Sequence, residues 1–148
     1  MEFPILALIG QDESRAWVEQ HFHPNGLKCP QCGAGIEEGR VFRQTRRSQL
    51  KVYRCRCGQT YNLYTGTVFA QHHLSPAQVV LLMRGVLKGE TTAALSRELG
   101  IGYEALLKLR HELQEQAEHL QPTSVLPDTE IESDEMFQNA GEKRNATP

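Results

Sequence analysis

The chain of 148 residues lacks a general excess of positive charge, because its 16 lysines and arginines are outnumbered by 18 aspartates and glutamates. This balance excludes a basic coat that would bind nucleic acid over the whole surface. No apolar stretch is long enough to cross a bilayer. The start, MEFPILALIG, carries Glu2 where a secretory signal needs a positive charge. We therefore expect a soluble cytoplasmic protein.

Positive charge is instead concentrated in one segment. Residues 1–74 hold nine Lys/Arg against six Asp/Glu, whereas residues 121–148 hold two against six. Residues 40–56 contain no acid, and their seven cations, called the basic stripe below, are Arg40, Arg43, Arg46, Arg47, Lys51, Arg54 and Arg56. Such a stripe predicts contact with phosphate, with Arg43, Arg46, Arg47 and Lys51 as the candidate contacts. Arginine and lysine also cover the open face of small sheets without binding anything.

The four cysteines would face a reducing cytosol, where their paired spacing favours metal binding over disulfides. KCPQCG places Cys29 and Cys32 in the C-x-x-C spacing of a zinc knuckle. YRCRCG holds Cys55 and Cys57 only two positions apart, so the backbone must bend there to aim both sulfurs at one point. We predict a structural zinc ion held by all four thiolates. The alternative is that Cys55 or Cys57 is a buried apolar residue, and that the metal is absent or bound through another group such as His23.

The pattern of elements predicts a small α+β fold in four segments. Residues 1–26 form an N-terminal helical segment with a helix over 11–22, for which Asp12 is the expected N-cap. Residues 27–74 form a zinc β-ribbon, with strands in VFRQT, QLKVYRC and TYNLYTGTVF. Residues 75–120 are helical, starting with Ser75 and Pro76 and interrupted at Gly89. Residues 121–148 are a Pro-containing linker and a mostly disordered acidic tail.

The run TTAALSRELGIGYEALLKLRHEL fits a helix-turn-helix, in which Gly100 takes the turn. Its expected buried positions are Leu95, Leu99, Ile101, Leu106 and Leu109, with Ser96 as the small residue at the close approach. The second helix then starts near Tyr103 and presents Tyr103, Lys108 and Arg110 toward a major groove. Any small helical bundle with a tight glycine turn would give the same pattern.

Taken in order, KCPQCG, YRCRCGQTYNLYTGTVF, SPAQVVLLMRGVLKGETTAALSRELGI and ESDEMFQNAGEK resemble the N-terminal part of bacterial insertion-sequence transposases of the ISXO-like DDE family. The resemblance runs roughly from Trp17 to Lys143. It implies that the four cysteines ligate zinc and that residues 103–110 read DNA. It also implies that Asp134 corresponds to the first catalytic carboxylate, on the first strand of an RNase H-like domain that uses Mg²⁺ or Mn²⁺.

The chain continues for only 14 residues beyond Asp134, which leaves no room for the further acids that two-metal chemistry needs. The resemblance therefore implies a truncated or frame-shifted product that recognises double-stranded DNA at element ends, associates with the nucleoid, and is not an enzyme alone. Its protein partner would be a second copy or the full-length transposase. One alternative is a stand-alone DNA-binding regulator or transposition inhibitor. Another is a zinc-ribbon module for protein interaction.

Overall fold

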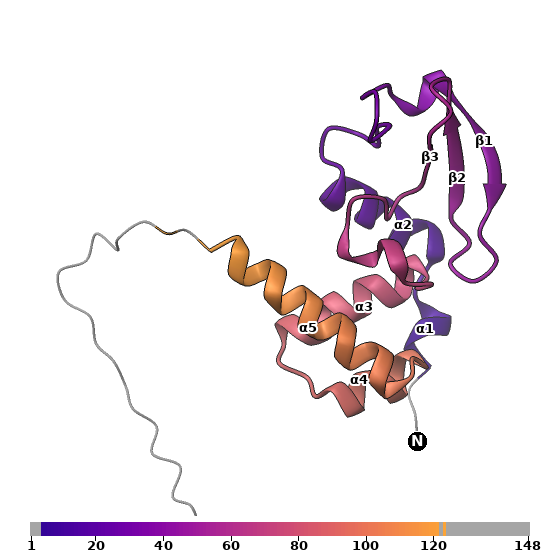
Figure 1. Ribbon diagram of the computed structural model, residues 1–148. Helices are drawn as coiled ribbons and strands as arrows, with labels where there is room; N and C mark the ends of the chain where they lie inside the picture. The colour runs from indigo at the N-terminus through magenta and orange to yellow at the C-terminus, as the bar shows by residue number, and fades with distance from the viewer. Residues whose placement is uncertain (1–3, 122, 124–148) are drawn as a thin grey trace, which may run out of the picture.

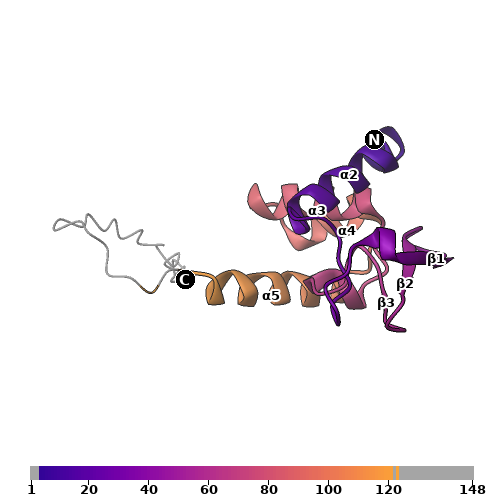
Figure 2. The ribbon, with the colours of Figure 1, turned by 90° about the horizontal axis from the view of Figure 1, so that it is seen from above.

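The computed structural model describes residues 4–121 and residue 123, which form a small α+β structure (Figure 1). In these residues there are five α-helices, two short 3-10 helices and a three-stranded antiparallel sheet, which lies at one end of the molecule (Figures 1 and 2). In chain order the elements are α1 (Ile5–Leu8), α2 (Gln11–Phe22), η1 (Ile36–Glu38), β1 (Gly39–Gln44), β2 (Lys51–Cys55), β3 (Thr60–Tyr61), η2 (Val68–Gln71), α3 (Pro76–Leu87), α4 (Thr92–Leu99) and α5 (Tyr103–His119). The α+β class expected from the sequence is confirmed.

Helix α2 occupies the predicted range, but its predicted N-cap is wrong. The capping position is Gly10, and Asp12 lies within the first turn, where Oδ1 accepts a 2.8 Å hydrogen bond from Arg15. The hydroxyl of Ser14 donates to the carbonyl oxygen of Gly10. A negative charge in the first turn still favours the helix through its dipole, so the acid contributes from a position inside the helix.

The sheet has the strand order β1-β2-β3, and a bulge interrupts the β1–β2 pairing. Val41 pairs with Tyr53 and Arg43 pairs with Val52, so Phe42 is the extra residue of the bulge. The turn between these strands closes where Thr45 N–H donates to the Leu50 carbonyl at 2.9 Å. The strands expected in VFRQT and QLKVYRC therefore form an antiparallel hairpin.

The third predicted strand is mostly wrong, because β3 ends at Tyr61. The Asn62 side chain accepts a hydrogen bond from the Tyr64 N–H, and Gly66 has a left-handed φ of 78°. Thr67 then caps η2 by accepting from the Phe69 N–H. Local side-chain bonds of this kind satisfy the backbone without a strand partner, and they outweigh the β propensity of the segment.

Helix α3 begins with the predicted signal. Ser75 and Gln78 form a capping box in front of Pro76. The Gln78 side chain also donates through Nε2 to the Leu99 carbonyl at 2.9 Å, which ties the start of α3 to the end of α4. Gly100 adopts the left-handed conformation, with φ of 64°, that the predicted turn between α4 and α5 requires.

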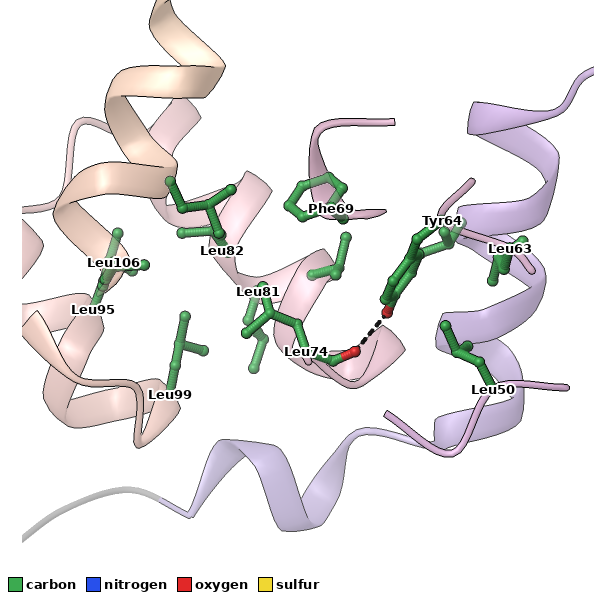
Figure 3. Close-up of a cluster of buried hydrophobic side chains, with 13 residues drawn as sticks. Leu50, Leu63, Tyr64, Phe69, Leu74, Leu81, Leu82, Leu95, Leu99 and Leu106 are labelled. Atoms are coloured by element: carbon green, nitrogen blue, oxygen red, sulfur yellow. Dashed lines mark hydrogen bonds between the residues drawn. The ribbon is translucent and has the colours of Figure 1, made fainter. Parts of the chain in front are cut away.

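One hydrophobic core joins three of the predicted segments (Figure 3). Val18 of α2, Leu50 of the hairpin and Tyr64 after β3 all belong to it, together with buried residues of α3, α4 and α5. The Tyr64 hydroxyl donates to the Leu74 carbonyl at 2.9 Å, as the dashed line in Figure 3 shows. Leu95, Leu99, Leu106 and Leu109 are buried as predicted, and Ile101 is partly buried.

The C-terminal half of α5 leaves this core and extends away from the other elements (Figure 2). Residues 114–121 are all exposed, and Leu120 is 83% exposed. No helix in the described part of the chain combines the length and the apolar character needed to cross a membrane.

Helix α3 offers a direct test of the core. Leu82 has no exposed surface, whereas Leu87 on the same helix is 83% exposed. We expect Leu82→Ala to lower the free energy of unfolding by about 2–5 kcal/mol because it leaves a cavity, and Leu87→Ala to change it by less than about 0.5 kcal/mol. Urea unfolding followed by circular dichroism measures both. Equal effects of the two substitutions would contradict this assignment of the core.

Candidate metal centre and basic surface

The four cysteines converge on one point. Their Sγ atoms all lie within 4.8 Å of one another. The shortest approaches join the two sequence pairs, at 3.6 Å between Cys29 and Cys57 and at 3.5 Å between Cys32 and Cys55. A disulfide needs about 2.05 Å, and all four cysteines are free. In a tetrahedral site with Zn–S bonds of about 2.3 Å, the sulfurs are about 3.8 Å apart, so the observed spacing suits a single ion.

The first pair sits in a turn closed by its own backbone. Cys29 N–H donates to the Ala34 carbonyl at 2.8 Å, and Gly33 N–H donates to the Cys29 carbonyl at 2.9 Å. Gly33 has φ of 75°, which only glycine adopts readily. The turn directs the backbone amides of Gln31 and Cys32 at the Cys29 sulfur. Amide hydrogen bonds of this kind orient a ligating thiolate and stabilise its charge.

The second pair repeats this arrangement with one residue fewer. Cys55 N–H donates to the Gln59 carbonyl at 2.9 Å, and Gly58 N–H donates to the Cys55 carbonyl at 3.0 Å. Gly58 has φ of 93°, and the amide of Gln59 hydrogen-bonds the Cys57 sulfur. Cys55 ends β2 and Cys57 lies in the turn that follows, so both sulfurs reach the same side. The bend expected for this spacing is therefore present.

The close approach of the sulfurs and amides shifts the pKa values of the Cys29 and Cys32 thiols in opposite directions. Burial would raise the pKa of Cys29, but hydrogen bonds from the amides of Cys32 and Gln31 outweigh it and lower that pKa to about 7. The amide of Ala34 acts to lower the pKa of Cys32, yet the neighbouring thiols of Cys55 and Cys29 raise it to about 12. Four adjacent thiolates therefore require a cation, and a divalent metal meets that requirement.

A buried hydroxyl beside the cluster also fits a charged centre. Tyr61 is 2% exposed and packs with Leu27, Cys29 and Cys55 in a second, small core. Among the described side chains, its hydroxyl is one of two buried polar groups without a hydrogen-bond partner. Burial raises the pKa of Tyr61, so the hydroxyl keeps its proton and remains a hydrogen-bond donor next to the thiols.

The donor set specifies the kind of site. Four sulfur ligands favour a soft or borderline ion such as zinc and leave no open position for water, so the cluster can hold a structural metal. His23, the alternative ligand considered from the sequence, is occupied elsewhere, since its Nε2 lies 2.7 Å from the Leu63 carbonyl. It does not belong to the group of potential ligands, which consists of the four cysteines.

The basic stripe lies on the surface of β1, β2 and their connecting turns. All seven of its cations are exposed. In the described part of the chain, none of the seven lies within 4.0 Å of a carboxylate oxygen, whereas Arg15, Arg84 and Lys108 each do. The basic stripe therefore forms no ion pair with the described residues.

The three predicted contacts on α5 occupy different environments. Tyr103 is 47% exposed at the start of the helix. Lys108 is exposed, with Nζ 3.9 Å from a Glu112 carboxylate oxygen. Arg110 is half-buried and donates through Nη1 to the Glu90 carbonyl at 2.6 Å, so it anchors α5 to the loop before α4. Asp134, the predicted catalytic residue, lies outside the described residues.

Two features of the surface could not be read from the sequence. The guanidinium of Arg54 lies 5.6 Å from the centre of the Phe42 ring, an arrangement that depends on the bulge in β1. His72 Nε2 lies 3.1 Å from a Glu112 carboxylate oxygen and links the segment after η2 to α5. Both contacts join residues that are distant in sequence. The one local signal is that Val41 and Phe42 are consecutive apolar residues, which is typical of an irregular strand.

Comparison of the chain with protein-family models finds no match, and comparisons with curated proteins and with solved structures find none either.

Removal of the metal tests the cluster. We expect purified protein to contain one zinc ion per chain by elemental analysis, and Cys29→Ser to lose it. Since a structural metal contributes folding free energy directly, chelation should lower the melting temperature by at least about 10 °C. Hydrogen exchange should show loss of protection over residues 27–61. Identical melting of the wild-type protein with and without chelator would refute the metal centre.

Proposed function

We propose that this chain is the DNA-binding part of an insertion-sequence transposase, in which a zinc ribbon and a helix-turn-helix together recognise double-stranded DNA at element ends. The zinc ion stabilises the ribbon over residues 27–61, the basic stripe contacts phosphates, and α5 reads bases. Transposase identity rests on the succession of motifs in the sequence. DNA binding rests on one observation above all: seven exposed cations, none of which lies within 4.0 Å of a carboxylate oxygen of the described residues.

Charge and geometry both support the phosphate contacts. Half to two-thirds of protein–DNA hydrogen bonds go to phosphate and sugar, and arginine and lysine supply many of them. The turn between β1 and β2 presents Arg46 and Arg47 side by side, both exposed. Uncompensated arginines on a sheet repel one another, and a phosphate backbone removes that repulsion while releasing its counterions.

The second helix supports base reading through residues at its start. In a helix-turn-helix, side chains near the N-terminus of the second helix reach base edges. Tyr103 is the first residue of α5, and Lys108 lies about one and a half turns further on, with an exposed side chain. Arg110 acts as a positioning residue, because its guanidinium donates to the Glu90 carbonyl and the Thr92 hydroxyl and thereby anchors α5 to the start of α4.

A second candidate function is protein interaction through the ribbon. Val41 and Phe42, both more than half exposed, give β1 an apolar surface that DNA phosphates would not use. Exposed apolar side chains that lie next to each other can mark a docking site for another protein. Binding to duplex DNA separates the two candidates, because only the first predicts a strong dependence on salt.

A salt titration tests the DNA proposal. The affinity for duplex DNA of random sequence should fall steeply with salt, since each phosphate contact contributes about 0.9 to the slope of log affinity against log salt. Replacing both Arg46 and Arg47 by glutamine should reduce that slope by roughly 1–2. Lys88→Gln removes an exposed cation outside the stripe and serves as the control. No measurable binding at low salt would reject the proposal.

Substitutions of two cations on α5 should distinguish base recognition from stabilisation of the helix. Arg110→Ala breaks the hydrogen bonds to the loop before α4, so it should lower the free energy of unfolding by about 1–2 kcal/mol. Lys108→Ala should leave stability unchanged and alter the base preference, measured by selection from a randomised duplex. The opposite pattern, with Lys108→Ala destabilising and Arg110→Ala only changing preference, would show that the roles are reversed.

A further inference from the structure

An aromatic ring is displayed on the most positive part of the surface. Phe42 is 51% exposed, and it occupies the bulge of β1, where the strand turns this extra residue out of the regular alternation. Large aromatic side chains are normally buried, since exposure forfeits about 1.5–3 kcal/mol of hydrophobic stabilisation. A ring kept in solvent by a specific distortion of the strand is a candidate contact for a ligand.

One arginine lies over this ring, and two more are its neighbours in the sheet. The guanidinium of Arg54 lies 5.6 Å from the ring centre, within the range of a cation–π interaction. Arg40 is the direct cross-strand partner of Arg54, and Arg43 follows Phe42 along β1. Like charges directly opposite one another destabilise a sheet. A bound anion would relieve this repulsion between Arg40 and Arg54.

A hollow of about 530 Å³ adjoins the ring through Arg54. Arg40, Arg54 and Arg56 line it together with Glu37 and Glu38. No ion pair within 4.0 Å joins these acids to these arginines in the described residues. One guanidinium is thus shared between an aromatic face and a polar hollow, which matches the two parts of a nucleotide, a flat base and a phosphate.

We infer that the β1–β2 face binds an unpaired nucleotide of single-stranded nucleic acid, with the base stacked on Phe42 and the adjoining phosphate held by Arg40 and Arg54. The inference rests on the proposed DNA-binding function and extends it from duplex to unpaired strand. Stacking on an aromatic side chain needs the face of a base, which a duplex hides inside its own stack. Phosphate contacts do not distinguish the two forms, so Phe42 is the residue that does.

A second copy of the chain fits this face less well. Two β1 strands paired edge to edge would bring the arginines at positions 40 and 43 of both copies together without an acid on that strand. Charged residues and a bulge on an edge strand are features that prevent such pairing. A single strand of nucleic acid supplies the opposite charge and a flat apolar surface together.

The test compares three probes with the same number of phosphates in each strand: a thymidine oligonucleotide, an abasic oligonucleotide of equal length and a duplex. Binding of each is followed by fluorescence anisotropy. Phe42→Ala should weaken binding to the thymidine strand by roughly fivefold or more, since stacking contributes about that factor for each base. It should leave the abasic strand and the duplex unchanged. Val41→Ala, the matched change of an exposed apolar neighbour on β1, should alter none of the three. A uridine strand identifies RNA or DNA as the preferred source.

Three outcomes would overturn the inference. These are equal losses on the thymidine and abasic strands, equal effects of Phe42→Ala and Val41→Ala, and no preference of the wild-type chain for the thymidine strand over the abasic one. Phe42→Leu keeps an apolar side chain without the aromatic face and should behave as Phe42→Ala, which guards against a folding defect. Zinc content and melting temperature are measured for each variant. Failure of duplex binding would reject the proposed function, whereas intact duplex binding with any of these outcomes rejects the stacking site alone.

Discussion

Convergence of four sulfur atoms is the constraint on which the sheet depends. The second core contains only Leu27, Cys29, Cys55 and Tyr61 as buried residues. Burial of an apolar side chain contributes about 1.5–3 kcal/mol, whereas ordering the backbone of one residue costs about 1–2 kcal/mol. Apart from Leu50, which belongs to the main core, residues 27–61 have only this small core to order them. A metal ion bound by both turns would add its binding free energy to folding, because the unfolded chain has no preformed site.

The cysteine cluster adjoins two cations of the basic stripe, since Arg54 and Arg56 alternate with Cys55 and Cys57 along the chain and are exposed. Four thiolates around one divalent ion would carry a net negative charge. These arginines would then stabilise the centre from outside while remaining accessible to an anion. A bound metal would therefore place a negatively charged centre and exposed arginines within a few residues of each other in the chain.

Local signals in the sequence predicted most of the helices and strands. Features that depend on contacts between distant segments could not be predicted in this way. The helix over 11–22 and the left-handed turn at Gly100 follow from residues next to them in the chain. The convergence of the four cysteines could be predicted, because their paired spacing is typical of residues that ligate one metal ion. The strand expected over 60–69 was wrong, since its side chains hydrogen-bond their own backbone. The anchoring role of Arg110 depends on a loop 20 positions away, which no local pattern reveals.

The side chain of Gln78 links two helices and so affects how the protein could meet a long ligand. Its Oε1 accepts from the Ser75 N–H, and its Nε2 donates to the Leu99 carbonyl, so one side chain fastens the beginning of α3 to the end of α4. One residue before Ser75, the Leu74 carbonyl receives the hydroxyl of Tyr64 from the segment that leaves the sheet. These hydrogen bonds join the segment after β3 to the start of α3 and to the end of α4. A long ligand that contacts all three would therefore have to fit its own curvature to this arrangement.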